Sequence, residues 1–172
     1  APGIAASAEL TSLDVGWNSI TDDGAQALAD VVLDKQSLQS FCNIPLQQLR
    51  TDSLTELNLQ HKGIGVPGAL VLAHFLRVTA SLTKINLGDN GVKDEGTTII
   101  CDALRDSKVS KLKELVLWRN GITVTGAESV AAYLAVTASL TALDVRYNRL
   151  GKEGEALLQQ AVQGRSGFDL KI

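Results

Sequence analysis

The residues with the clearest chemical potential form the run Gly63-Ile64-Gly65-Val66-Pro67-Gly68. This run satisfies the GxGxxG pattern of a dinucleotide-binding loop, and Asp89 follows about 20 residues later, where such a loop requires a carboxylate for a ribose hydroxyl. However, Gly63 has counterparts at Gly91 and Gly121, and Gly68 has one in every full repeat described below. The repeat therefore accounts for Gly63 and Gly68, and only Gly65 remains to be explained. For this reason the sequence favours a structural role for the run over nucleotide binding.

The histidines and cysteines are the other candidates for catalysis or metal binding. His61 is expected at a strand exit beside Asp89, a pair that could orient a base, but no nucleophile is placed next to it. His74 lies in a predicted helix without metal-ligand spacing around it. Cys42 and Cys101 fall two units apart, and we expect both to be unpaired and buried. The sequence therefore predicts no catalytic residue, no metal site and no cofactor.

These residues belong to a pattern that repeats along the chain. Five segments align position by position: LTSLDVGWNSI from Leu10, LTELNLQHKGI from Leu54, LTKINLGDNGV from Leu82, LKELVLWRNGI from Leu112 and LTALDVRYNRL from Leu140. Positions four and six of each segment are apolar, which is typical of a half-buried strand. Apolar residues three and four apart follow, and predict amphipathic helices near 22–33, 67–78, 95–106, 125–136 and 153–163.

Strands and helices that alternate at a fixed period must form parallel strands with right-handed crossovers, and neighbouring units must stack to bury a core. The motif LxxLxLxxNxI followed by GxxxLxxxL resembles the leucine-rich repeat of the ribonuclease-inhibitor-like type over residues 10–172. The resemblance implies an α/β solenoid, a right-handed horseshoe with a parallel sheet on its concave face and helices on its convex face. It also implies a turn asparagine at position nine, where the units carry Asn18, Lys62, Asn90, Asn120 and Asn148.

We expect one leucine-rich-repeat domain over residues 1–172, with full units from about 10, 54, 82, 112 and 140. Residues 38–53 form a truncated, irregular unit with a short strand and at most one helical turn, since Pro45 lacks a backbone donor. Residues 168–172 alternate like a last edge strand. Neither end resembles a polar cap, so we expect a piece of a longer array or an end covered by another chain, for example by self-association through the C-terminal edge strand.

Composition narrows the class of partner. The formal net charge is −3 and 45% of residues are apolar, which indicates a folded chain that is not built to neutralise phosphates. We therefore expect no nucleic-acid partner, and no membrane partner because no apolar run approaches the ~18 residues of a bilayer span. Two cysteines and the absence of Asn-x-Ser/Thr motifs favour a cytoplasmic location.

Positions seven and eight of each unit are predicted to line the concave face or the strand exit. Position eight carries Trp17, Pro45, His61, Asp89, Arg119 and Tyr147, and position seven carries Gly16, Ile44, Gln60, Gly88, Trp118 and Arg146. Because adjacent strands lie ~4.8 Å apart, Trp118, Arg119, Arg146 and Tyr147 should form one patch. Trp, Tyr and Arg are enriched in interface hot spots. Alternatively, an indole and a guanidinium stack on one another across the strands and only stabilise the sheet.

We predict a protein–protein interaction module without intrinsic catalysis. In this hypothesis Trp118, Arg119, Arg146 and Tyr147 anchor another protein, and Trp17 and His61 form a second contact region. One alternative is a GTPase-activating domain, since similar repeats occur in the activator of the Ran GTPase; a GTP-hydrolysis assay would separate it from passive binding. The other is an immune-sensor-like regulatory repeat domain within a larger protein.

Overall fold

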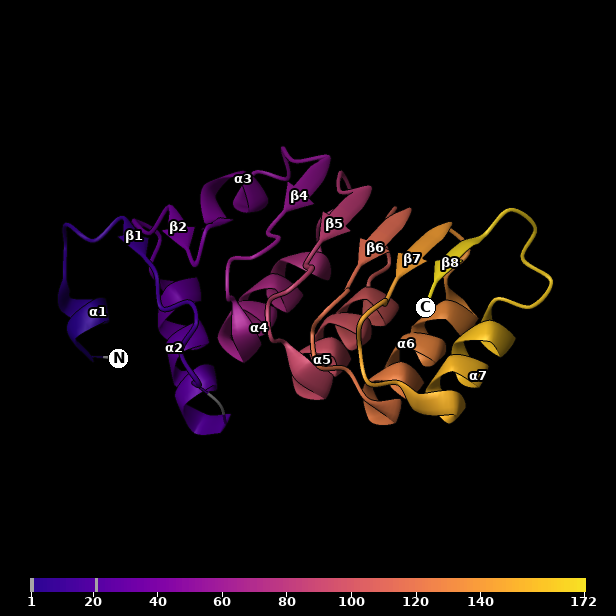
Figure 1. The fold of residues 1–172 in the computed structure, drawn as a ribbon. Helices are drawn as coiled ribbons and strands as arrows, with labels where there is room; N and C mark the ends of the chain where they lie inside the picture. Colours follow the sequence, from indigo (N-terminus) through magenta and orange to yellow (C-terminus); the bar gives the residue numbers. More distant parts are fainter. Residues whose placement is uncertain (1, 21) are drawn as a thin grey trace.

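Each full unit folds into a short strand followed by a helix, and the units stack into an arc with strands along one side and helices along the other (Figure 1). The computed structural model describes residues 2–20 and 22–172. The strands are β1 (Ser12–Leu13), β2 (Ser40–Phe41), β3 (Ile44–Pro45), β4 (Glu56–Asn58), β5 (Lys84–Asn86), β6 (Glu114–Val116), β7 (Ala142–Asp144) and β8 (Asp169–Lys171). The helices are α1 (Pro2–Ala6), α2 (Asp22–Asp34), α3 (Leu46–Arg50), α4 (Gly65–Leu76), α5 (Lys93–Asp106), α6 (Val124–Val136) and α7 (Gly151–Ala161).

The strands form two hydrogen-bonded ladders. Strands β4 to β8 make a five-stranded parallel sheet in chain order. In the other ladder β1 pairs with β2 in parallel, but β2 pairs with β3 antiparallel. The chain reverses there through Cys42 and Asn43, which have the left-handed φ values of 46° and 64°. The truncated unit therefore interrupts the parallel sheet, and this hairpin directs Ile44 into the core, so the prediction that Ile44 lines the concave face was wrong.

The core follows the repeated apolar positions. In the Leu82 unit, Leu82, Ile85, Leu87 and Val92 are all buried, and equivalent residues of neighbouring units join them in one continuous cluster. The inner faces of α4, α5 and α6 close this cluster from the convex side. No helix within residues 2–20 and 22–172 is long and apolar enough to cross a bilayer.

Both cysteines are free and buried in this core, as expected. Burial in apolar surroundings raises the pKa of the Cys42 thiol to about 11 and that of the Cys101 thiol to about 12. Both groups are therefore protonated at neutral pH, and a thiol is a far weaker nucleophile than a thiolate. The two cysteines act as small apolar side chains.

A ladder of asparagine side chains joins the strand-exit loops. The Asn120 side-chain carbonyl accepts hydrogen bonds from the backbone N–H groups of Asn90 (3.1 Å) and Val92 (3.3 Å) in the preceding unit. Its amide nitrogen donates to the backbone carbonyls of Leu87, Leu117 and Trp118. Asn90 and Asn148 bridge their neighbours in the same way. Each amide thus satisfies buried backbone groups of two units, as the resemblance implied.

Tyr133 on α6 carries a hydroxyl that lies near Thr137 without a hydrogen bond of good geometry to it. Its side chain is buried, and its hydroxyl has no hydrogen-bond partner among the described residues. Leaving a buried hydroxyl unsatisfied costs about 1–3 kcal/mol. We expect Tyr133→Phe to raise the free energy of unfolding by about 1 kcal/mol in urea titrations. Tyr147→Phe, which removes an exposed hydroxyl, should change nothing. A destabilised Tyr133→Phe protein would show that the hydroxyl has a partner after all.

Candidate functional site

The position-eight residues of the five full units share an unusual backbone conformation, which Pro45 of the truncated unit does not adopt. Trp17, His61, Asp89, Arg119 and Tyr147 have φ values between 52° and 61°, in the left-handed region that side-chain-bearing residues adopt infrequently. This turn ends each strand and projects the side chain outward, so that Trp17 is 69% exposed and Tyr147 is 74% exposed. Five equivalent turns place a row of side chains along the strand-exit face, all exposed except the partly buried Asp89. The sequence predicted the row but not the conformation that produces it.

Trp118, at position seven, is held from two sides. Its indole lies over Gly88, where even a Cβ atom would overlap the indole Nε1. The His61 ring meets it edge-on, with ring centroids 5.3 Å apart and an interplanar angle of 76°. Residues from units two repeats apart therefore touch, because no bulky side chain stands between them at Gly88. The structure thus brings His61 to Trp118, whereas the sequence had grouped it with Trp17.

His61 also carries the predicted contact with Asp89. The His61 Nδ1 atom lies 2.7 Å from Asp89 Oδ2, and half of the His61 side chain is exposed. The other histidine, His74, is exposed on α4, with its ring edge-on to Phe75. No group of three or more histidine, cysteine or acidic residues within 2–20 and 22–172 is arranged to hold a metal ion.

Arg146 is fixed by a carboxylate of its own strand. Its Nε and Nη2 atoms donate to Asp144 at 3.0 Å and 2.7 Å, and its guanidinium carbon lies 5.9 Å from the centre of the Tyr147 ring. The guanidinium thus faces a tyrosine of the same unit, whereas the indole of Trp118 packs against a glycine and a histidine. Arg119 is exposed at the next position along the row.

The Asp144 carboxyl is 8% exposed, and this burial alone would raise its pKa. Hydrogen bonds from the side chain and backbone N–H of Arg146 more than offset that effect and hold the pKa below its ordinary value. Because the unfolded chain binds this proton more readily, the pair contributes stability above about pH 4, and that contribution is lost as the pH falls further.

We therefore expect wild-type stability to fall between about pH 5 and pH 3 more steeply than that of Asp144→Asn, which has no carboxyl to titrate at this position. Chemical denaturation at a series of pH values measures this difference. Asp169→Asn is the control, since Asp169 is an exposed carboxylate on the neighbouring strand β8. Parallel pH profiles for wild type and Asp144→Asn would contradict the expected role of the pair.

The GxGxxG run is part of the repeat structure. The N–H groups of Ile64 and Gly65 donate to the side chain and backbone carbonyls of Asn90, and the Gly68 N–H donates to the Ile64 carbonyl. These donors are therefore not available to a pyrophosphate. Gly65 has a φ of 54° at the entry to its helix, like Lys93 (58°) and Gly151 (64°) at the same position of other units. The glycine left unexplained by the sequence is thus a helix-entry residue.

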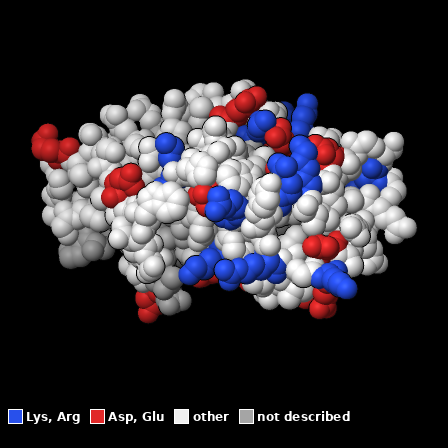
Figure 2. All heavy atoms as spheres, in the orientation of Figure 1, with Lys and Arg blue, Asp and Glu red and all other residues white. Residues whose placement is uncertain are grey.

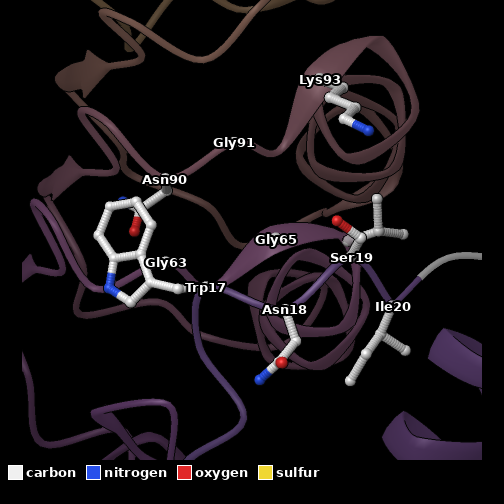
Figure 3. A pocket seen from close by; sticks show the side chains of 10 residues that line it. Trp17, Asn18, Ser19, Ile20, Gly63, Gly65, Asn90, Gly91 and Lys93 are labelled. Atoms are coloured by element: carbon white, nitrogen blue, oxygen red, sulfur yellow. The ribbon is translucent and has the colours of Figure 1, made fainter.

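A hollow opens where the ladder of asparagines is interrupted. Lys62 replaces the amide that would hold the loop of the first unit, where the backbone N–H of Trp17 donates to the Gly63 carbonyl at 3.1 Å. The hollow has a volume of about 200 Å³. Figure 3 shows the Trp17 indole on one side of it and the Lys93 side chain on the other, with Gly65 and Gly91 between them.

Comparisons with known proteins agree with this geometry. A family model described as "Leucine Rich repeat" matches residues 7–29, 80–98 and 138–154. Among solved structures, the actin-binding site 2 of leiomodin-1 superposes with a TM-score of 0.64 over 75% of this chain and 77% of that chain. The sequence identity in that pair is 18%, so the likeness is one of fold.

Curated relatives are similar over most of the chain. It is 31% identical to ribonuclease inhibitor from Sus scrofa over 153 residues, which are 89% of this chain and 30% of that protein. It is 29% identical to NACHT, LRR and PYD domains-containing protein 5 from Homo sapiens over 160 residues, which are 93% of this chain and 12% of that protein. The chain thus spans about a third or less of the length of these relatives. The repeat geometry and these similarities confirm the predicted resemblance and fold: the chain folds as a leucine-rich-repeat solenoid and is similar to proteins of the ribonuclease-inhibitor-like type.

Proposed function

We propose that this protein is a protein-binding module without intrinsic catalysis, and that its strand-exit face carries an anchor patch for the partner. The anchor patch consists of Trp118, Arg119, Arg146 and Tyr147, extended by His61. The observation that carries the proposal is the fixed placement of these side chains: one repeated backbone turn projects His61, Arg119 and Tyr147 outward, and contacts with neighbouring residues hold Trp118 and Arg146 beside them. Trp17, beyond His61 along the row, remains the second contact region.

Preorganisation supports this role. Trp118 is held by Gly88 and His61, and Arg146 is held by Asp144, before any partner arrives. Ordering a long side chain on binding costs about 0.5–1.5 kcal/mol, so side chains that are already ordered retain more of their contact energy. Trp, Tyr and Arg are also the types that dominate measured interface energies. Ribonuclease inhibitor, by its name, acts on another protein, which agrees with a binding role.

Affinity capture from a lysate of the source organism tests the proposal. We expect the wild-type chain to capture a protein that the quadruple alanine variant of Trp118, Arg119, Arg146 and Tyr147 does not, with both chains folded by circular dichroism. The matched control is the quadruple alanine variant of Lys152, Glu155, Gln159 and Gln160, four exposed residues of α7, which should capture like wild type. Capture of the same protein by the anchor-patch variant would remove the patch from the proposal.

A second candidate is a regulatory repeat domain of a larger, immune-sensor-like protein. It is favoured by the relatives named NACHT, LRR and PYD domains-containing proteins, in which the repeats are one of several kinds of domain. An immunoblot of the source lysate tests this candidate, since the chain alone has a mass of 18.2 kDa. A band at that mass alone would argue against it. The GTPase-activating alternative has no further support in the geometry or the relatives and is not proposed.

A further inference from the structure

A groove runs along the strand-exit face beside the anchor patch. Its main part has a volume of about 450 Å³ and is lined by Trp17, Lys93, Arg119 and Arg149 among others. It shares Trp17, Gly91 and Lys93 with the hollow of Figure 3, so the two form one continuous depression. All five full repeat units contribute to the lining of this depression, and the truncated unit does not.

The groove concentrates positive charge in an acidic chain. Lys93, Arg119 and Arg149 are exposed, and none has an ion-pair partner within the part of the chain that the structure describes. They occupy positions twelve, eight and ten of three successive units, so only the stacking of the units brings them together. Figure 2 shows a run of Lys and Arg side chains across the middle of the face that these loops form.

The two carboxylates of the groove are already engaged. Asp89 contacts His61. Asp94 accepts hydrogen bonds from the backbone N–H and hydroxyl of Thr123, at 2.7 Å and 2.6 Å, and from the Gly126 N–H at 3.0 Å. Asp94 therefore holds the start of the neighbouring helix. Neither carboxylate forms an ion pair with the three cations among the described residues, so the lining carries three cations against two carboxylates.

The floor of the groove is open backbone. Gly91 and Gly121 have φ values of 65° and 74°, and a Cβ atom added at either glycine would meet no atom within 4 Å. An extended chain could therefore lie close to these loops. Arginine side chains pair with carboxylates, as they do with phosphates, through two parallel hydrogen bonds, so the two arginines of the groove suit an anionic ligand.

We propose that this groove binds an extended acidic peptide segment of the partner, with its carboxylates on Lys93, Arg119 and Arg149. The inference rests on the proposed protein-binding function and names the chemistry of the segment bound. A nucleic acid fits less well, because a strand that extends beyond the groove would meet the rest of a chain whose net charge is −3, whereas a short acidic segment meets the cations of the groove.

Fluorescence anisotropy with a fluorescein-labelled deca-glutamate peptide at about 0.1 M salt tests the proposal, because that salt screens distant charges but leaves close pairs. We expect the peptide to bind wild type and the deca-glutamine peptide not to bind. Lys93→Glu/Arg149→Glu should weaken binding about 10-fold or more, equivalent to about 1.4 kcal/mol. Its control, Lys108→Glu/Lys113→Glu, makes the same charge change at exposed residues of the opposite, helix-to-strand edge and should bind like wild type.

Tryptophan emission locates the peptide. In a Trp118→Phe background Trp17 is the one remaining tryptophan, and we expect its emission to shift when deca-glutamate is added. Equal weakening in the two charge-reversal variants, an unchanged Trp17 emission, or equally tight binding of poly-uridylate would each overturn the proposal. The groove variants leave Trp118, Arg146 and Tyr147 intact, so a failed peptide experiment does not bear on capture through the anchor patch.

Discussion

Replacing Asn120 by alanine is expected to lower the free energy of unfolding by about 3 kcal/mol or more. The side chain is 1% exposed and joins two units through five hydrogen bonds to backbone groups. Alanine would leave the N–H groups of Asn90 and Val92 without an acceptor, and an unsatisfied buried group costs about 1–3 kcal/mol. Three backbone carbonyls would also lose a donor, so the loops of two units should loosen together.

Asn18→Ala is the matched control, because it makes the same substitution at the same repeat position. The Asn18 side chain is exposed and donates to the carbonyls of Val15 and Gly16 within its own loop. Water can replace these bonds, so we expect a loss of about 1 kcal/mol or less. Guanidinium unfolding curves of both variants, recorded by circular dichroism, provide the comparison. Similar losses in the two variants would mean that the ladder does not couple the units.

Trp118→Ala is expected to weaken binding of the partner captured by the wild-type chain about 30-fold, a loss of about 2 kcal/mol. The indole stands on a glycine and against a histidine, so alanine removes a large, ordered contact surface. Val78→Ala, which truncates an exposed apolar residue just beyond α4, should leave the affinity unchanged. Isothermal titration calorimetry with the purified partner measures both variants.

Gly88→Ala tests the same anchor without altering the indole. A Cβ atom at Gly88 would overlap Trp118 Nε1, so the ring must move, and we expect a loss of affinity close to that of Trp118→Ala. Gly24→Ala is the control, because a Cβ atom there would meet Ile20 Cγ2 at an ordinary 3.6 Å. Full affinity in Gly88→Ala would show that the position of the indole does not matter, and the anchor patch would then lose its central residue.

Sequence periodicity alone was enough to predict most of the fold. The helices predicted near 67–78, 95–106 and 125–136 lie at 65–76, 93–106 and 124–136. The buried Asn90 and Asn120 were also identified by their repeat position. These features could be predicted because each unit meets the same neighbours above and below it. A given position therefore has the same burial and the same hydrogen-bond requirement every time it recurs.

The departures from periodicity were decided by tertiary structure. The hairpin at Cys42 and Asn43 places Ile44 in the core because the truncated unit has room only for the five-residue helix α3, and the chain must reverse within a few residues to reach it. Periodicity does not describe a unit whose helix is shortened in this way. The sequence located the irregularity there but not the direction of its side chains.

The anchor patch and the groove also combine features that the sequence predicted with features that only the tertiary structure decided. The row at position eight followed from the repeat, since one turn recurs in every full unit. The repeat did not predict two other features, namely the contact of His61 with Trp118 and the grouping of Lys93, Arg119 and Arg149. These residues occupy different positions of different units. Their proximity depends on how far each loop projects and on which intervening residues are glycine. Those distances are set by the stacking of whole units, so the chemistry of the binding face emerged only in three dimensions.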